Sequence, residues 1–199
     1  IDPDYRSKGL LYILYGLTVV IMFCRKRLAP IWVSNVTQVP AVVGSFSEGF
    51  NNVFPNALKN SRRSFDHLSL VRQIMLNHTH VFGVGNDAEF DEKTFIIKNA
   101  YTGGSDNLLK TWNQVTKYRN DTVNDFCQKH LNYDRGDDFI QIGKFDFFAL
   151  QKYIIRMIPA KSLILILNNI FIVFLQSILL PVYHWFKADT STIYLKSRA

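Results

Sequence analysis

Two nearly uncharged apolar segments lie on either side of a polar region of ordinary composition. The first covers 9–24, contains no charged residue in sixteen positions, and is followed directly by Arg25, Lys26 and Arg27. As a helix it would be about 24 Å long, slightly shorter than a hydrocarbon core of about 30 Å. This pattern predicts a membrane-spanning helix over 9–30, with a buried core helix as the alternative.

The second apolar segment covers 162–180 and consists mostly of Leu, Ile, Val and Phe. It begins after Lys161 and is followed by Tyr183 and Trp185, residue types that are common at membrane interfaces. Its length and composition predict a second membrane-spanning helix over 162–185.

Polar residues inside the second segment follow a seven-residue spacing. On a helix this spacing forms one stripe that drifts by only about 20° per step, and polar stripes hold helices together in membranes. We therefore expect contacts with partner helices at this stripe and at the neighbouring amide. The residues predicted to make these contacts are Ser162, Asn168, Asn169, Gln176 and Tyr183.

Between these segments, 31–161 is predicted to be mostly helical. Apolar residues at helical spacing favour helices over 61–76, 105–131 and 145–158, whereas 31–55 reads as extended or irregular chain and 132–143 as a loop. The predicted fold class is a mainly α membrane protein, with two transmembrane helices flanking a region of about 130 residues. The predicted tails are 1–8 and 186–199.

The net charge of +7 is concentrated near the ends of the apolar segments. This distribution favours lipid headgroups as partners over nucleic acid, which is bound by a clustered basic face. The 145–158 segment reads either as an amphipathic helix beside the membrane or as an ordinary solvated helix. The predicted membrane-interface anchors are Arg25, Lys26, Arg27, Lys152, Arg156, Lys161 and Trp185.

Candidate catalytic and metal-binding motifs are incomplete. His78 and His80 have no third ligand at suitable spacing, and the glycines at 83–85 lack the Lys of a phosphate-binding loop. The acidic residues at 87–92 do not match a calcium loop. We therefore expect no catalytic residues, no metal and no cofactor, and we expect Cys24 and Cys127 to be unpaired.

Signals for the side of the membrane that 31–161 faces disagree. The basic triplet favours the cytosol or the mitochondrial matrix, whereas the glycosylation sequons at Asn35, Asn77 and Asn120 favour a lumen or the cell exterior. Chance alone predicts about one to two sequons in this composition. A first residue other than Met is explained by removal of a targeting peptide or by a trimmed start.

The favoured function is a non-catalytic accessory subunit of a multi-subunit membrane complex. We expect the mitochondrial inner membrane, with a respiratory-chain complex or the ATP synthase as host, an assignment made by analogy with small helical subunits. Its expected partners are other membrane subunits and phospholipids, with no nucleic acid. The alternatives are a plasma-membrane or secretory-pathway glycoprotein with a binding ectodomain, and a small transporter or lipid-acting enzyme.

Overall fold

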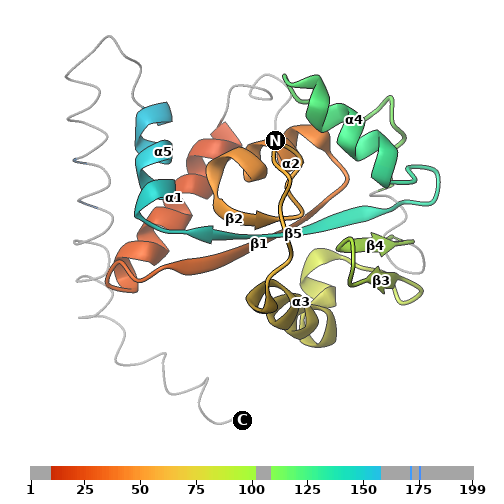
Figure 1. Ribbon diagram of the computed structural model, residues 1–199, viewed down its shortest axis with the longest axis horizontal. Coiled ribbons are helices and arrows are strands. Elements are labelled where there is room, and N and C mark those ends of the chain that lie inside the picture. Colours follow the sequence, from red (N-terminus) through yellow and green to blue (C-terminus); the bar gives the residue numbers. More distant parts are fainter. Residues whose placement is uncertain (1–9, 102–108, 158–170, 172–174, 176–199) are drawn as a thin grey trace. The chain divides into compact units, whose positions relative to one another are not determined.

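The chain forms two compact units, one of 1–31 with 145–199 and one of 32–144. The computed structural model describes residues 10–101 and 109–157, together with residues 171 and 175. Both described ranges contain helices as well as strands (Figure 1). The result is a mixed α/β fold in place of the predicted mainly helical one.

The described part of the first unit is a pair of helices, α1 (Leu10–Arg25) and α5 (Phe147–Met157). The Phe23 ring of α1 is fully buried and meets Phe145 and Phe147 edge-on, at centroid distances of 5.4 and 5.6 Å. Gly16 lets α5 approach closely, because a Cβ there would lie 2.0 Å from the Tyr153 ring. The apolar side of α1 is therefore covered by the chain itself.

The second unit is built on a five-stranded sheet whose path is β1 (Ile31–Thr37), β5 (Asp138–Phe145), β4 (Ile96–Lys98) and β3 (Glu89–Asp91). The remaining strand, β2 (Asn51–Phe54), also pairs with β5. The β2–β5, β4–β5 and β3–β4 pairs are antiparallel. Since β2 lies opposite Ile142 and β4 opposite Phe139, they contact different parts of the same strand.

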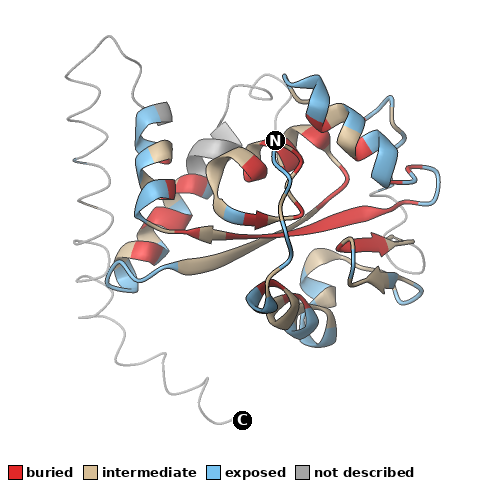
Figure 2. Cartoon of the chain, viewed as in Figure 1, coloured by how far each residue is buried: buried red, intermediate tan, exposed pale blue. Residues whose placement is uncertain are grey.

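The strand β5 is the centre of this unit, and Figure 2 shows it buried along nearly its whole length. Side chains alternate between the faces of a strand. Phe139 accordingly joins the cluster of α2 (Pro40–Gly49) and α4 (Asp121–His130). Ile140 and Ile142 join the opposite cluster, which contains Val71 of α3 (Phe65–Asn77). Helices therefore cover both faces of the sheet.

Local signals explain where the helices of this unit begin. Ser64 caps α3 by accepting from the His67 N–H at 3.3 Å, and Asn120 caps α4 by accepting from the Thr122 N–H at 3.0 Å. Pro40 occupies the first turn of α2, where its missing N–H is not needed. The 3₁₀ helix η2 (Thr79–Phe82) ends at Gly83, whose φ of 68° lies in the left-handed region.

Several predicted elements are confirmed and others are wrong. The helices over 61–76 and 145–158 correspond to α3 and α5. The helix over 105–131 is wrong in extent, because Asn120 starts α4. The irregular 31–55 segment contains α2 between two strands, and the predicted loop over 132–143 contains most of β5.

The predicted membrane fold is contradicted. Across 10–101 and 109–157, and at 171 and 175, no helix has both the length and the apolar character needed to cross a membrane. α1 has sixteen residues, and Val20 and Phe23 are buried against the chain's own residues. The predicted membrane and mitochondrial location rested on this fold and is contradicted for the same reason. The second predicted span, 162–185, lies outside the described residues except at 171 and 175.

Candidate functional site

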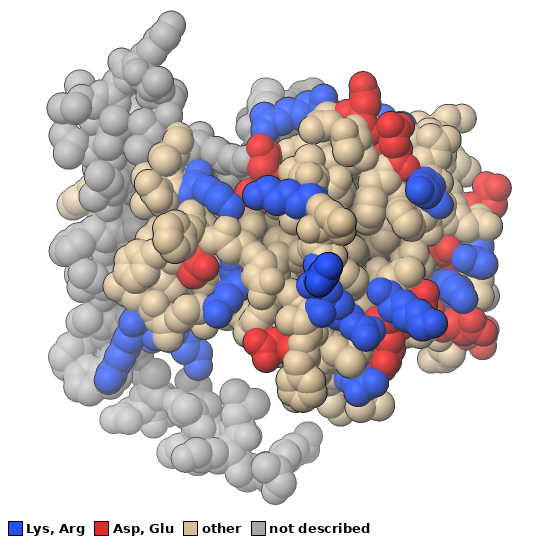
Figure 3. Space-filling view, in the orientation of Figure 1, with Lys and Arg blue, Asp and Glu red and all other residues tan. Residues whose placement is uncertain are grey.

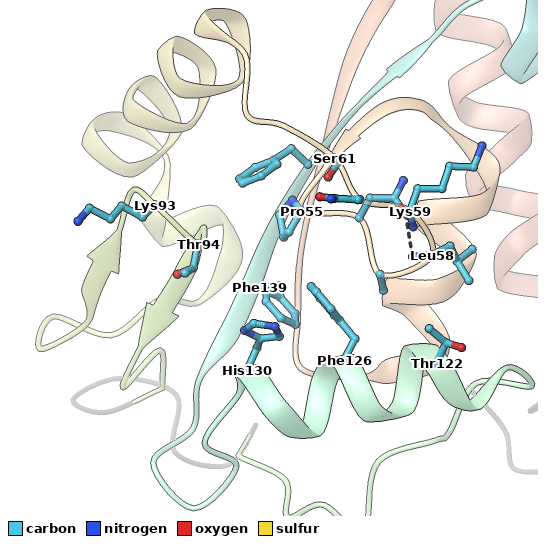
Figure 4. Close-up of a pocket in the computed structure, with 14 residues that line it drawn as sticks. Pro55, Leu58, Lys59, Ser61, Lys93, Thr94, Thr122, Phe126, His130 and Phe139 are labelled. Carbon is cyan, nitrogen blue, oxygen red and sulfur yellow. Dashed lines mark hydrogen bonds between the residues drawn. The ribbon is translucent and has the colours of Figure 1, made fainter.

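The main candidate site is an open cavity of about 440 Å³ in the 32–144 unit. It lies between β5, α4 and the segment that follows β2 (Figure 4). Cavities that bind small molecules typically have volumes of about 300–1,000 Å³, mostly apolar walls and a few polar groups. This cavity meets both criteria.

Aromatic rings form the apolar wall of the cavity. Phe126 of α4 and Phe139 of β5 stack with centroids 5.2 Å apart and planes inclined by 22°. His130, one helical turn after Phe126, lies 4.7 Å from that ring. Figure 4 shows these three side chains together at one side of the cavity. Phe54 and Pro55 complete the apolar surface, which suits a flat apolar group.

Buried polar groups hold the chain segment after β2 in place. The Gln141 Nε2 donates to the Pro55 carbonyl at 3.0 Å and to Ser47 Oγ at 3.1 Å. Ser47 Oγ in turn accepts from the Ala57 N–H at 3.3 Å. Asn56 Oδ1 accepts from the Leu58 and Lys59 N–H groups and closes the next turn. The wall formed by 55–59 is therefore tied to both β5 and α2.

His67 fixes the start of this segment from the other side of the sheet. Its fully buried ring donates from Nε2 to the Asn52 carbonyl at 2.7 Å, while Nδ1 accepts from the Ser64 N–H at 3.1 Å. Burial lowers the His67 pKa, which the hydrogen bond to Asn52 and the nearby Asp66 charge partly oppose. A neutral ring with one protonated nitrogen satisfies both contacts.

The polar lining of the cavity is neutral or basic. Its side chains include Asn60, Ser61 and Thr122 with the cations Lys59 and Lys93, and none of the described residues that line it is Asp or Glu. Burial, followed by the Lys129 charge, lowers the pKa of His130, so this imidazole is neutral at pH 7 and can donate or accept a hydrogen bond.

A second buried polar cluster lies at the start of β5. The Tyr101 hydroxyl donates to Asp138 Oδ2 at 2.6 Å, and Asp138 Oδ1 has no hydrogen-bond partner. Burial raises the Asp138 pKa to about 7; the Tyr101 hydrogen bond opposes this shift and the neighbouring Asp137 charge adds to it. Asp137 is held by a bidentate contact with Arg135 at 2.7 and 2.6 Å. This cluster is sealed within the unit and does not line the cavity.

Only some of the residues predicted from the sequence can be placed relative to this cavity. All five predicted partner contacts (Ser162, Asn168, Asn169, Gln176 and Tyr183) lie outside the described residues, as do Lys161 and Trp185. Arg25, Lys26 and Arg27 are exposed at the end of α1, and Lys152 is half-buried on α5. The structure describes the backbone of Arg156 but not its side chain. None of the described anchors lines the cavity.

The smaller sequence motifs also have defined places. The His78 and His80 rings lie 6.5 Å apart, and the described residues contain no group of three metal-type ligands. Cys24 and Cys127 are free, as expected. Among the sequons, Asn35 lies in β1 with a buried Nδ2, whereas Asn77 and Asn120 are exposed.

Sequence reasoning missed the cavity because its rings come from distant parts of the chain. Phe126 was expected only as an apolar residue of a helix, and Phe139 fell in a predicted loop. The one signal available was the high Phe content, sixteen in 199 residues. No protein family, curated protein or solved structure matches the chain.

Proposed function

We propose that this chain is a non-catalytic binding protein whose 32–144 unit holds a small ligand with a flat apolar body. This retains the general part of the accessory role expected from the sequence, a protein that acts by binding. The cavity with its stacked Phe126 and Phe139 rings is the observation that supports it. A flat ligand inserted beside these rings would replace water with aromatic contacts.

The arrangement of the cavity walls supports a binding role, because contacts within the fold fix both walls. Phe139 is buried, and Gln141 ties the opposite wall at Pro55 to the same strand. Both walls are therefore held in position before a ligand arrives, which reduces the conformational entropy lost on binding.

The proposal is tested by titrating the full chain with N-phenylnaphthylamine, an uncharged fluorescent probe of two flat aromatic groups. We expect saturable binding to one site, measured by fluorescence of the directly excited probe. In Thr122→Trp, an exposed residue of the lining is replaced by a large ring that fills the cavity mouth. This variant should bind about tenfold more weakly, equivalent to about 1.4 kcal/mol.

Gln128→Trp is the matched control, because Gln128 is exposed on the same helix and does not line the cavity. It should bind the probe as the unmodified chain does. Equal binding by all three proteins, or no saturable binding, would contradict the proposal. Circular dichroism of each variant verifies that α4 is retained.

A further inference from the structure

The cavity is bordered by basic groups from two separate segments. Lys59 lies in the segment after β2, and Lys93 lies in the turn between β3 and β4. Arg62 is exposed three residues after Lys59. Figure 3 shows Lys and Arg side chains gathered over the chain that leads into α3. We call Lys59 and Lys93 the basic rim.

Acidic groups near the basic rim already have partners. Arg72 forms a bidentate contact with Glu92 at 2.6 and 2.8 Å, and Arg63 donates to the Glu92 carbonyl. Asp91 accepts from the Thr94 hydroxyl at 2.7 Å and from the Lys93 N–H at 2.9 Å. Within the described ranges, no cation of the basic rim forms an ion pair.

This distribution of charge has a consequence for the ligand. The aromatic wall can hold a flat apolar body, while the cavity opening has cations on two sides and no acidic side chain in its lining. A cationic ligand would be repelled there, although aromatic rings alone can attract cations. An anionic group is favoured by the basic rim, because opposite charges attract and no described acidic side chain forms an ion pair with a rim cation.

We propose that the ligand is a small aromatic anion, with its ring against Phe126, which stacks on the buried Phe139, and its carboxylate, phosphate or sulfonate at the basic rim. This inference rests on the proposed binding function and specifies the ligand's chemical class. Figure 4 shows Lys93 and Lys59 on either side of the rings, with both side chains turned away from them. Exposed side chains change rotamer within nanoseconds, so both ammonium groups can turn toward a bound anion.

Polar groups inside the cavity support the same orientation. The Ser61 and Thr122 hydroxyls and the Asn60 amide line it and can donate hydrogen bonds to an anion. The neutral His130 ring adds one further donor or acceptor beside Phe126. Donors together with cations are the chemistry that carboxylates and phosphates require.

Two probes with the same ring system separate the contribution of the aromatic rings to binding from that of the negative charge. N-phenylnaphthylamine is uncharged, and anilinonaphthalene sulfonate carries one negative charge on the same rings. We expect the full chain to bind the sulfonate several-fold more tightly than the neutral probe. Raising the ionic strength from about 0.01 M to about 1 M shortens the Debye length from about 30 Å to about 3 Å. That change should remove most of the preference.

Charge variants locate the preference at the basic rim. Lys59→Gln and Lys93→Gln should each weaken sulfonate binding about twofold to fivefold, the range expected for exposed charge pairs. Because both residues line the cavity, binding of the neutral probe can also change, but by a smaller factor. Lys110→Gln is the matched control, since Lys110 is an exposed lysine outside the lining. It should change neither probe.

The results distinguish the proposed binding function from the proposed negative charge of the ligand. A Lys59- and Lys93-dependent preference for the sulfonate supports an aromatic anion as ligand. If the neutral probe binds at the site blocked by Thr122→Trp but the sulfonate binds no more tightly, the anion inference is overturned and the binding function stands. An equal loss in Lys110→Gln would also overturn it. If neither probe binds at that site, both proposals fail.

Discussion

The contacts inside one unit of this protein differ in kind from the contacts inside the other. In the described part of the 1–31 and 145–199 unit, α1 and α5 meet through apolar and aromatic groups, with Phe23 at the centre. In the 32–144 unit the core also contains buried polar side chains, each placed among apolar clusters. They are Thr37, Gln38, Ser47, His67, Asp137, Asp138 and Gln141.

This difference determines how each unit responds to change. Apolar packing depends on volume and shape, and is insensitive to pH over the neutral range. Buried polar groups depend on complete hydrogen bonding and on protonation state, because an unpaired buried group costs about 1–3 kcal/mol. Volume changes therefore test the helical pair best, and changes of charge or hydrogen bonding test the sheet unit best.

The largest expected effect is from Phe23→Ala in the helical pair. Phe23 is fully buried, and its truncation leaves a cavity between the rings of Phe145 and Phe147. The free energy of unfolding should fall by about 3–5 kcal/mol, measured by urea denaturation. Met22→Ala changes the neighbouring residue, which is 52% exposed, and should change stability by about 0.5 kcal/mol or less. Equal losses of stability in the two variants would contradict the prediction, because they would show that Met22 is packed as tightly as Phe23.

An effect of intermediate size is expected from Asp138→Asn, and it should depend on pH. The carboxyl pKa is raised by burial to about 7, compared with about 3.9 in an unfolded chain. A raised pKa means that the folded state binds the proton more tightly. The stability contributed by this proton is complete below pH 4 and is lost as the pH rises to about 7.

Asp138→Asn should remove this loss, because the amide keeps the shape of the protonated acid and can bond with the Tyr101 hydroxyl. The shift of about three pKa units corresponds to about 4 kcal/mol at about 1.4 kcal/mol per unit. An amide N–H at the Oδ1 position, which has no hydrogen-bond partner, costs about 1–3 kcal/mol. At pH 8 the variant should therefore be about 2 kcal/mol more stable than the unmodified chain. Urea denaturation from pH 4 to pH 8 measures the difference. Asp134→Asn, which removes an exposed carboxylate from the turn before β5, is the control and is measured over the same pH range. A pH-independent difference for Asp138→Asn would contradict the raised pKa.

The helical pair shows what an apolar pattern can and cannot predict. Uncharged residues over 9–24 correctly predicted a helix, and the spacing within 145–158 correctly predicted α5. Period and composition do not distinguish a lipid neighbour from a protein neighbour, since both accept an apolar face. Gly16 was the available signal for close helix packing, but a single glycine identifies neither the partner Tyr153 nor its distance.

The sheet unit and its cavity were harder to predict for a related reason. β5 is buried on both faces, so its sequence lacks the alternation of polar and apolar residues that indicates a half-buried strand. The acidic residues before it resemble a loop, although Asp137 and Asp138 are buried and held by Arg135 and Tyr101. The contact between Tyr101 and Asp138 joins distant parts of the chain and is created by the tertiary fold, and the rings of Phe126 and Phe139 meet for the same reason.

The smallest expected effect is from Gln141→Leu, which removes the polar link between β5 and the cavity wall. The substitution leaves the Pro55 carbonyl and the Ser47 hydroxyl without the Nε2 donor. It also removes Gln141 Oε1, a buried acceptor with no hydrogen-bond partner, and so relieves one desolvated group. The lost hydrogen bonds lower stability, and removal of the unpaired acceptor raises it. The free energy of unfolding should therefore fall by about 1 kcal/mol, less than if both polar atoms of the amide formed hydrogen bonds.

The same variant links the sheet unit's polar core to its cavity. Because Pro55 lines the cavity and loses its tether, binding of N-phenylnaphthylamine should weaken more than the loss of stability alone explains. Gln128→Leu, on the exposed side of α4, is the control for added apolar surface. If Gln141→Leu lowers stability but leaves probe affinity unchanged, the tether does not position the wall. If it changes neither, the buried amide is replaceable, and apolar packing is sufficient to hold the cavity wall.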